Sequence, residues 1–177
     1  MQAGLISDAS AKILQMSEPE DALSIIDFEH KKIHEGRNFF CTQSYTAVPD
    51  GERRAIILDS PAGAHHLMFG VYLSNGGTIE VYEDSDVVNG AVIPFFNSNR
   101  ASLIECSMNL YELGVITDLG TLIYTESFPD GSGPSTNRVS STSRNELILK
   151  PGIKYVIGAI SGSAGSTINI KIDWYMI

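Results

Sequence analysis

Apolar and polar residues alternate along several short segments of the chain, with turn-forming residues between them. Every second residue is apolar in Leu67–Ser74, and the pattern recurs in Thr167–Tyr175. A period of two places the apolar side chains on one face of a β-strand. The residues Asn-Gly-Gly at 75–77 tolerate the positive φ angles of tight turns, so they predict a hairpin between Leu67–Ser74 and Thr78–Glu83.

Strand-like segments fill most of the chain after residue 38. Further strands are predicted at Phe39–Val48, Arg54–Asp59, Ser102–Glu112, Leu119–Phe128, Asn145–Leu149 and Tyr155–Ile160, with a short apolar run at Val92–Phe96. A Ser/Gly loop at 161–166 predicts a second hairpin, and the Gly, Ser and Pro of 129–143 predict a long loop. Eight or nine short strands with no helix between them predict an all-β fold, an antiparallel β-sandwich of the jelly-roll type.

The first 28 residues have a different pattern. Apolar residues cluster loosely at 13–16 and 23–26 among helix-forming residues, and Pro19 interrupts any continuous helix. We therefore predict a short, partly helical N-terminal arm at 1–28 and a β-sandwich domain at 29–177. An arm of this kind either reaches a neighbouring subunit or frays in solvent.

The charge balance limits the classes of partner. With 12 basic and 21 acidic residues the formal net charge is −9, which argues against non-specific nucleic-acid binding and suits a partner with a basic patch. No apolar run approaches the ~20 residues of a membrane span, and the N-terminus lacks the features of a signal peptide. We expect a protein made in a reducing cytoplasm, with Cys41 and Cys106 as small buried residues; whether they pair stays open.

Two histidine pairs are candidate metal ligands. His30 and His34 are four residues apart, which on a helix places two imidazoles near one ion. No HExxH motif surrounds them and no third ligand is visible, so packing or an interface is the favoured interpretation. His65 and His66 precede a strand, where neighbours point to opposite faces, and one surface and one half-buried histidine are expected.

The sequence contains one acidic cluster and lacks the common catalytic motifs. Glu80, Glu83, Asp84 and Asp86 lie close in sequence, but they lack the pattern of a calcium loop, so a solvated strand end is favoured. The chain has no nucleophile elbow, no Cys–His signature and no phosphate-binding loop. We therefore expect no catalytic residues, no cofactor and no metal.

Four groups of residues resemble those of a known family. They are Glu29–Gly36 leading to Phe39 and Phe40, then Phe96–Arg100, Arg144–Lys150 and Asp173–Tyr175. In this order, over residues 28–177, the chain resembles small virion proteins of tailed bacteriophages that are usually encoded beside the major capsid protein. Several members are thought to be head decoration (cement) proteins, which bind the outside of the capsid as oligomers, often trimers. Residues 1–27 are outside the resemblance.

The resemblance implies a location, a partner and an interface. The protein is expected on the capsid surface of the virion, as a homo-oligomer (a trimer) bound to the major capsid protein, without enzymatic activity. Its arm and first motif are the candidates for the capsid or subunit interface. The predicted interface residues are Ile25, Ile26, Phe28, His30, Ile33, His34, Phe39 and Phe40.

Two other functional classes stay open. A carbohydrate- or receptor-binding module of a phage head fibre or tail has the same architecture and needs exposed aromatics, for which Trp174, Tyr175 and Tyr124 are the candidates. Trp174 shares a face with the isoleucines of its strand, which favours the core over a sugar platform. A small hydrolase would depend on Glu83 or Asp84.

Overall fold

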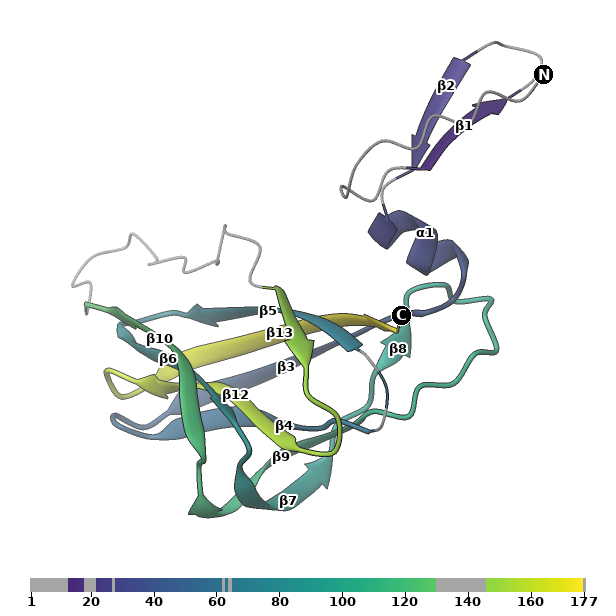
Figure 1. Ribbon diagram of the computed structural model, residues 1–177. Coiled ribbons are helices and arrows are strands. Elements are labelled where there is room, and N and C mark those ends of the chain that lie inside the picture. Colours follow the sequence, from purple (N-terminus) through teal and green to yellow (C-terminus); the bar gives the residue numbers. More distant parts are fainter. Residues whose placement is uncertain are drawn as a thin grey trace.

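Two antiparallel sheets face each other in the computed structural model, which describes residues 28–61, 63, 65–129 and 146–176 and the backbone of 13–17 and 22–26 (Figure 1). The five-stranded sheet has the order β11 (Glu146–Leu149), β5 (His65–Leu73), β13 (Ser166–Met176), β3 (Asn38–Val48) and β8 (Phe96–Asn97). The six-stranded sheet has the order β10 (Thr121–Phe128), β6 (Gly77–Glu83), β12 (Lys154–Ser161), β4 (Arg53–Asp59), β9 (Asn109–Asp118) and β7 (Asp86–Val92).

The strands alternate between the two sheets along the chain. From β3 to β6, and again from β10 to β13, each strand lies in the sheet opposite its predecessor. The predicted antiparallel β-sandwich is therefore confirmed. This alternation is consistent with a jelly roll, and that part of the prediction stays a prediction.

The five-stranded sheet buries one face, as its alternating sequence requires. In β5 and β13 every second side chain is buried, and the inward residues meet across the strands, as in the pairs Leu67 with Trp174 and Phe69 with Ile172. They form the main core together with the inward residues of the six-stranded sheet, such as Ile56 and Ile157.

The six-stranded sheet buries side chains on both faces near its centre. Ile56 and Leu58 of β4 belong to the main core, whereas Ala55 and Ile57 belong to a second cluster on the outer face. Val87 of β7 is buried in that second cluster, so the β7–β9 ribbon covers part of the outer face. This double coverage explains why 55–58 is a continuous apolar run rather than an alternating one.

The two predicted hairpins are wrong. β5 and β6 lie in different sheets, and so do β12 and β13, so both turns cross between the sheets. The crossings run alongside each other: the amide of Ser74 donates to the carbonyl of Thr167 over 3.0 Å, and that of Gly162 to Gly76 over 2.8 Å. These bonds satisfy turn backbone groups that would otherwise lack partners.

Strand boundaries differ from the prediction around residues 86–118. Residues 102–108 have no regular secondary structure, and β9 begins only at Asn109, so the strand predicted at Ser102–Glu112 is wrong in its first half. Asp86–Val92 forms β7, which alternation did not predict because Asn89 and Gly90 interrupt it. The loop predicted at 129–143 falls, beyond Pro129, outside the described residues.

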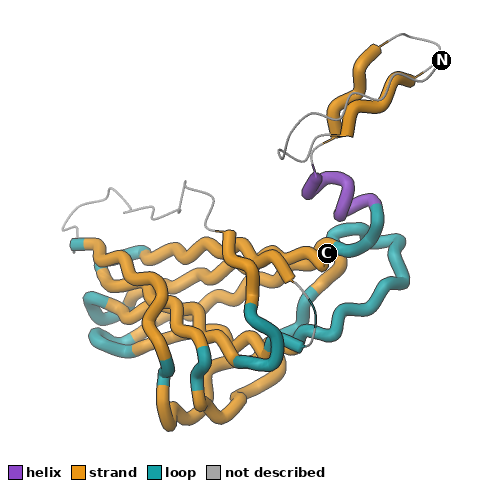
Figure 2. Tube along the Cα trace, viewed as in Figure 1, coloured by secondary structure: helices purple, strands orange, loops and turns teal. Residues whose placement is uncertain are grey.

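The N-terminal arm contains strands rather than helix where it is described. β1 (Ile13–Ser17) and β2 (Ala22–Ile26) pair antiparallel, which contradicts the predicted helical turns there. The helix α1 (Phe28–His34) begins only at the last residue of the predicted arm. The β1–β2 pair projects beyond α1, away from the two sheets (Figure 2). The division into 1–28 and 29–177 stays a prediction.

Candidate interaction site at the helix end

Helix α1 ends at a glycine cap. Gly36 has a φ of 70°, and its amide donates to the carbonyl of Ile33 while that of Arg37 donates to Lys32, each over 2.9 Å. This pair of bonds is the Schellman motif, which needs a residue in the left-handed region. Because seven residues are too few for a stable isolated helix, α1 depends on such caps and on its tertiary contacts.

Two asparagines, Asn97 at the end of β8 and Asn99 just after it, hold the end of the helix. The side-chain amide of Asn97 donates to the carbonyl of Gly36 over 2.7 Å, and that of Asn99 donates to the carbonyl of His34 over 3.2 Å. The Oδ1 of Asn97 in turn accepts the amide of Asn99 over 2.9 Å. The Phe96–Arg100 motif therefore positions the helix.

An aromatic cluster lies beneath these loops. The ring of Trp174 stacks on Phe39 at a centroid distance of 5.9 Å, and the rings of Trp174 and Phe95 meet edge to face at 5.2 Å. Its indole nitrogen donates to the Sγ of Cys106 over 3.2 Å, and burial raises the pKa of that thiol. Phe39 is 2% exposed, so its predicted place in an interface is wrong: it is a core residue.

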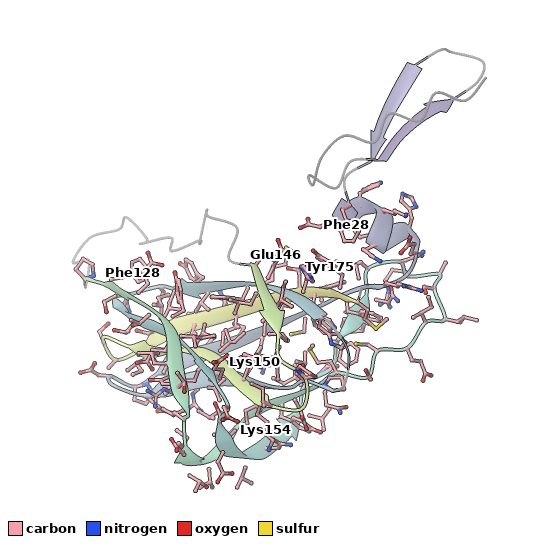
Figure 3. All side chains as sticks on the ribbon, in the orientation of Figure 1. Phe28, Phe128, Glu146, Lys150, Lys154 and Tyr175 are labelled. Atoms are coloured by element: carbon pink, nitrogen blue, oxygen red, sulfur yellow. The ribbon has the colours of Figure 1, made fainter. Side chains whose placement is uncertain are left out.

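A polar cluster joins α1 to the edge of the five-stranded sheet. The hydroxyl of Tyr175 donates to the Oε1 of Glu146 over 2.5 Å, and the Nδ1 of His66 lies 2.7 Å from the same oxygen. The rings of Phe28 and Tyr175 meet edge to face at a centroid distance of 5.7 Å (Figure 3). His65 is buried and His66 is half-buried, so the expected surface histidine is absent from this pair.

These contacts bring together described residues from each of the four groups of resembling residues. Phe40 lies 6.0 Å from Phe96 between ring centroids, and the amide of Met176 donates to the carbonyl of Arg37 over 3.0 Å. We call this part of the molecule the helix end: α1, the start of β3, residues 96–106, β11, the start of β5 and the last residues of β13.

The remaining predicted interface residues divide by exposure. His30 and His34 are exposed, whereas Phe28, Ile33 and Phe40 are half-buried. Ile25 and Ile26 lie in β2, and their side chains fall outside the described part of the chain. Their role in an interface stays a prediction.

Sequence reasoning missed an exposed apolar group beside α1. Phe96, Leu103 and Ile104 are exposed, and Leu103 reaches 96%. The loop packs on the helix cap, because a Cβ at Gly36 would overlap the Ser102 hydroxyl. The sequence pattern predicts a strand at Leu103 and Ile104, although their position between Ser102 and Glu105 is a signal of a surface loop. A second group lies on the β7–β9 ribbon and the start of β10: Val88, Val92, Val115, Ile116, Leu122 and Ile123.

The other candidate chemistry has structural explanations. Glu80 is paired with Arg53 and Glu83 with Lys150, each at 2.7 Å, so these carboxylates do not converge. Within the described residues, no three His, Cys, Asp or Glu side chains are grouped to hold a metal ion. Both cysteines are free, and burial raises the pKa of Cys41 to about 12.

The aromatic residues considered for sugar binding are not displayed. Trp174 and Tyr175 are buried. For Trp174 this confirms the prediction from the strand face that it shares with the isoleucines. Tyr124 is half-buried and meets the ring of Phe69 edge-on at 5.5 Å. These three residues therefore offer no exposed aromatic platform.

Comparisons with known proteins add no family. Family models, curated proteins and solved structures were compared with the chain, and none of them matches it. Among the described residues, no helix has the length and apolar character needed to cross a membrane. The geometry of the helix end and the resemblance seen in the sequence are the grounds for a functional proposal.

Proposed function

We propose that this protein is a structural virion protein of a tailed bacteriophage, which binds the outer surface of the capsid through the major capsid protein and stabilises it. The observation that carries the proposal is the helix end, where described residues from each of the four groups that resemble phage virion proteins meet in space. Residues such as Phe28, Asn97, Glu146 and Tyr175 are far apart in sequence, and together they fix α1 on the sandwich.

The exposed apolar side chains beside α1 support a binding role for this end. Leu103 is 96% exposed, and Ile104 in the same loop and Phe96 in β8 are exposed as well. Apolar side chains gathered on a surface favour association, because a partner removes them from water. Arg100 lies over the Phe96 ring at 4.9 Å, which adds a cation to the apolar group.

Oligomerisation would strengthen such a contact. Homo-oligomers are usually symmetric, so a trimer would present three helix ends and three arms in one geometry. Once one copy is bound, the effective concentration of the others multiplies weak contacts. The net charge of −9 suits a capsid surface with basic patches.

Binding to capsids tests the proposal directly. Capsids assembled from the major capsid protein of the same phage are mixed with the protein, sedimented and imaged by electron microscopy. We expect added density outside the shell, and capsids that resist heating better than bare ones. Deletion of residues 1–27 should leave a folded domain that no longer binds.

A pair of substitutions assigns the contact to one surface. Leu103→Asp at the helix end should abolish co-sedimentation, whereas Val115→Asp on the β7–β9 ribbon should leave it unchanged, because Val115 is 67% exposed and belongs to the other apolar group. Both proteins should keep the wild-type melting temperature. Absence of wild-type binding would reject the function, and loss of binding in the Val115 variant alone would move the contact to the ribbon.

A further inference from the structure

Two histidine rings on α1 point at each other at the surface. His30 and His34 are both exposed, and their Nε2 atoms are 2.9 Å apart. The rings meet edge to face, at a centroid distance of 4.7 Å. The sequence spacing allowed this arrangement only if 28–34 was helical, and α1 meets that condition.

The contact requires the two rings to share a proton. A neutral imidazole has one donor and one acceptor nitrogen, so one Nε2 donates and the other accepts. Two protonated rings would place like charges head to head. A divalent ion can replace the shared proton, because Zn²⁺ and its neighbours bind imidazole nitrogen at about 2.0–2.1 Å. The displaced proton then occupies the Nδ1 of the same ring, so the charge of the pair does not change.

The other soft ligands of the chain are not available. The chain has four histidines and two cysteines. His65 is buried, and the Nδ1 of His66 faces Glu146 and Tyr175. Burial raises the pKa of both thiols, which disfavours the thiolate that metals require.

The contacts that hold α1 in place favour a preformed pair of histidine ligands. Asn99 holds the carbonyl of His34, and Phe28 anchors the first turn on Tyr175. Ligands fixed before binding lose less conformational entropy when the ion arrives. An ion that bridges residues four apart also stabilises the helix.

We propose that His30 and His34 form a binding site for one divalent ion of the zinc, nickel or copper class, coordinated by the two Nε2 atoms with water in the remaining positions. The inference does not rest on the proposed capsid binding, because it concerns the free chain, although both histidines are also predicted interface residues. It is open to solvent, so it is expected to exchange metal freely rather than to hold a structural ion.

Titration with ZnCl₂ near neutral pH tests the site. Calorimetry on the full chain should show saturable binding of one ion per chain, and NMR of the imidazole nitrogens should show both Nε2 signals shifting with the proton on Nδ1. His30→Asn and His34→Asn should each weaken binding by about tenfold or more.

Lys31→Asn is the matched control, because Lys31 lies on the same exposed helix and pairs only with Glu35 among the contacts of its side chain that the structure describes. It should bind zinc as the wild type does. Backbone amide spectra establish that α1 is retained in each variant. Absence of saturable binding in the wild type, or equal affinity in the histidine variants, would overturn the proposal.

Discussion

The two ends of the sandwich are closed in different ways. At the crossover end, formed by the turns at 49–52, 74–76 and 162–165, backbone groups bond to one another. The amide of Gly51 donates to the carbonyl of Ser161 over 2.9 Å, and that of Gly162 donates to Gly76 over 2.8 Å. At the helix end, backbone bonds such as that from the Met176 amide to the Arg37 carbonyl are joined by longer side chains, among them Asn97, Asn99 and Glu146.

The two ends also differ in the apolar side chains that they expose to solvent. Backbone bonds and short polar side chains close the crossover end, and none of the exposed large apolar side chains that the structure describes lies in its turns. The helix end depends on particular side chains and still exposes Phe96, Leu103 and Ile104. A fold that can close without such side chains gains nothing in stability from displaying them, which favours a binding role for that end.

The largest expected effect comes from Trp174, the centre of the aromatic cluster. Trp174→Ala removes a fully buried ring stacked on Phe39 and should lower the free energy of unfolding by about 3–5 kcal/mol. Denaturant unfolding measures the loss. Trp174→Phe retains part of the ring stacking, so its free energy of unfolding should fall by clearly less than that of the alanine variant. A small loss in the alanine variant would mean that side chains do not hold this end.

A matched pair of glycines compares the two ends directly. Gly36 and Gly51 both have a φ of 70°, but a Cβ meets Ser102 at Gly36 and open space at Gly51. Gly51→Ala should cost about 1 kcal/mol from backbone strain alone. Gly36→Ala adds overpacking and should cost about 2–3 kcal/mol. Equal losses in thermal or denaturant unfolding would show that the 96–104 loop yields without cost.

Alternation predicted the strands of the five-stranded sheet because that sheet buries one face. It succeeded for Leu67–Leu73 and for Ile168–Trp174, where burial and period coincide. Turn residues at 75–77 and 161–166 located the chain reversals. They carried no information on which sheet the next strand joins, because the partner of a strand is fixed by tertiary packing rather than by the turn.

The candidate site was predicted only in part, for a related reason. The spacing of His30 and His34 indicated a shared helical face, but their approach needed α1, which local sequence alone does not stabilise. The sequence places Phe39 in the interface because it follows the first of the four resembling groups, whereas its burial depends on Trp174, far away in sequence. Contacts of this kind are not readable from one segment.

A pair of asparagines tests whether side-chain bonds matter more at the helix end. Asn97→Ala removes the 2.7 Å hydrogen bond that the Asn97 side-chain amide donates to the carbonyl of Gly36. This should lower the free energy of unfolding by about 1–2 kcal/mol. Asn75→Ala at the crossover end removes a 3.3 Å bond to the Ser166 hydroxyl and should cost about 0.5 kcal/mol. Denaturant midpoints at constant slope give both values, and a larger loss at Asn75 would contradict the comparison.

The smallest effect concerns His65, which pairs with Met176 and Leu149 at the helix end. Its ring is buried, and among the described residues neither nitrogen has a hydrogen-bond partner with good geometry. Burial holds the pKa of His65 below its ordinary value of 6.5. Well above that pH the ring is neutral in both states. As the pH falls below 6.5, the unfolded chain takes up the proton more readily than the folded one, so the free energy of unfolding decreases.

His65→Leu removes this titration while keeping an apolar side chain in place. Denaturant unfolding from about pH 7.5 to about pH 5 should show a steeper decline in the wild type than in the variant, since only the wild type gains a proton on unfolding at this position. The other titrating groups are common to both proteins, so the difference between the two curves isolates His65. Parallel curves would mean that the ring accepts its proton in the folded state as readily as in the unfolded chain, and that this buried position of the helix end is open to water.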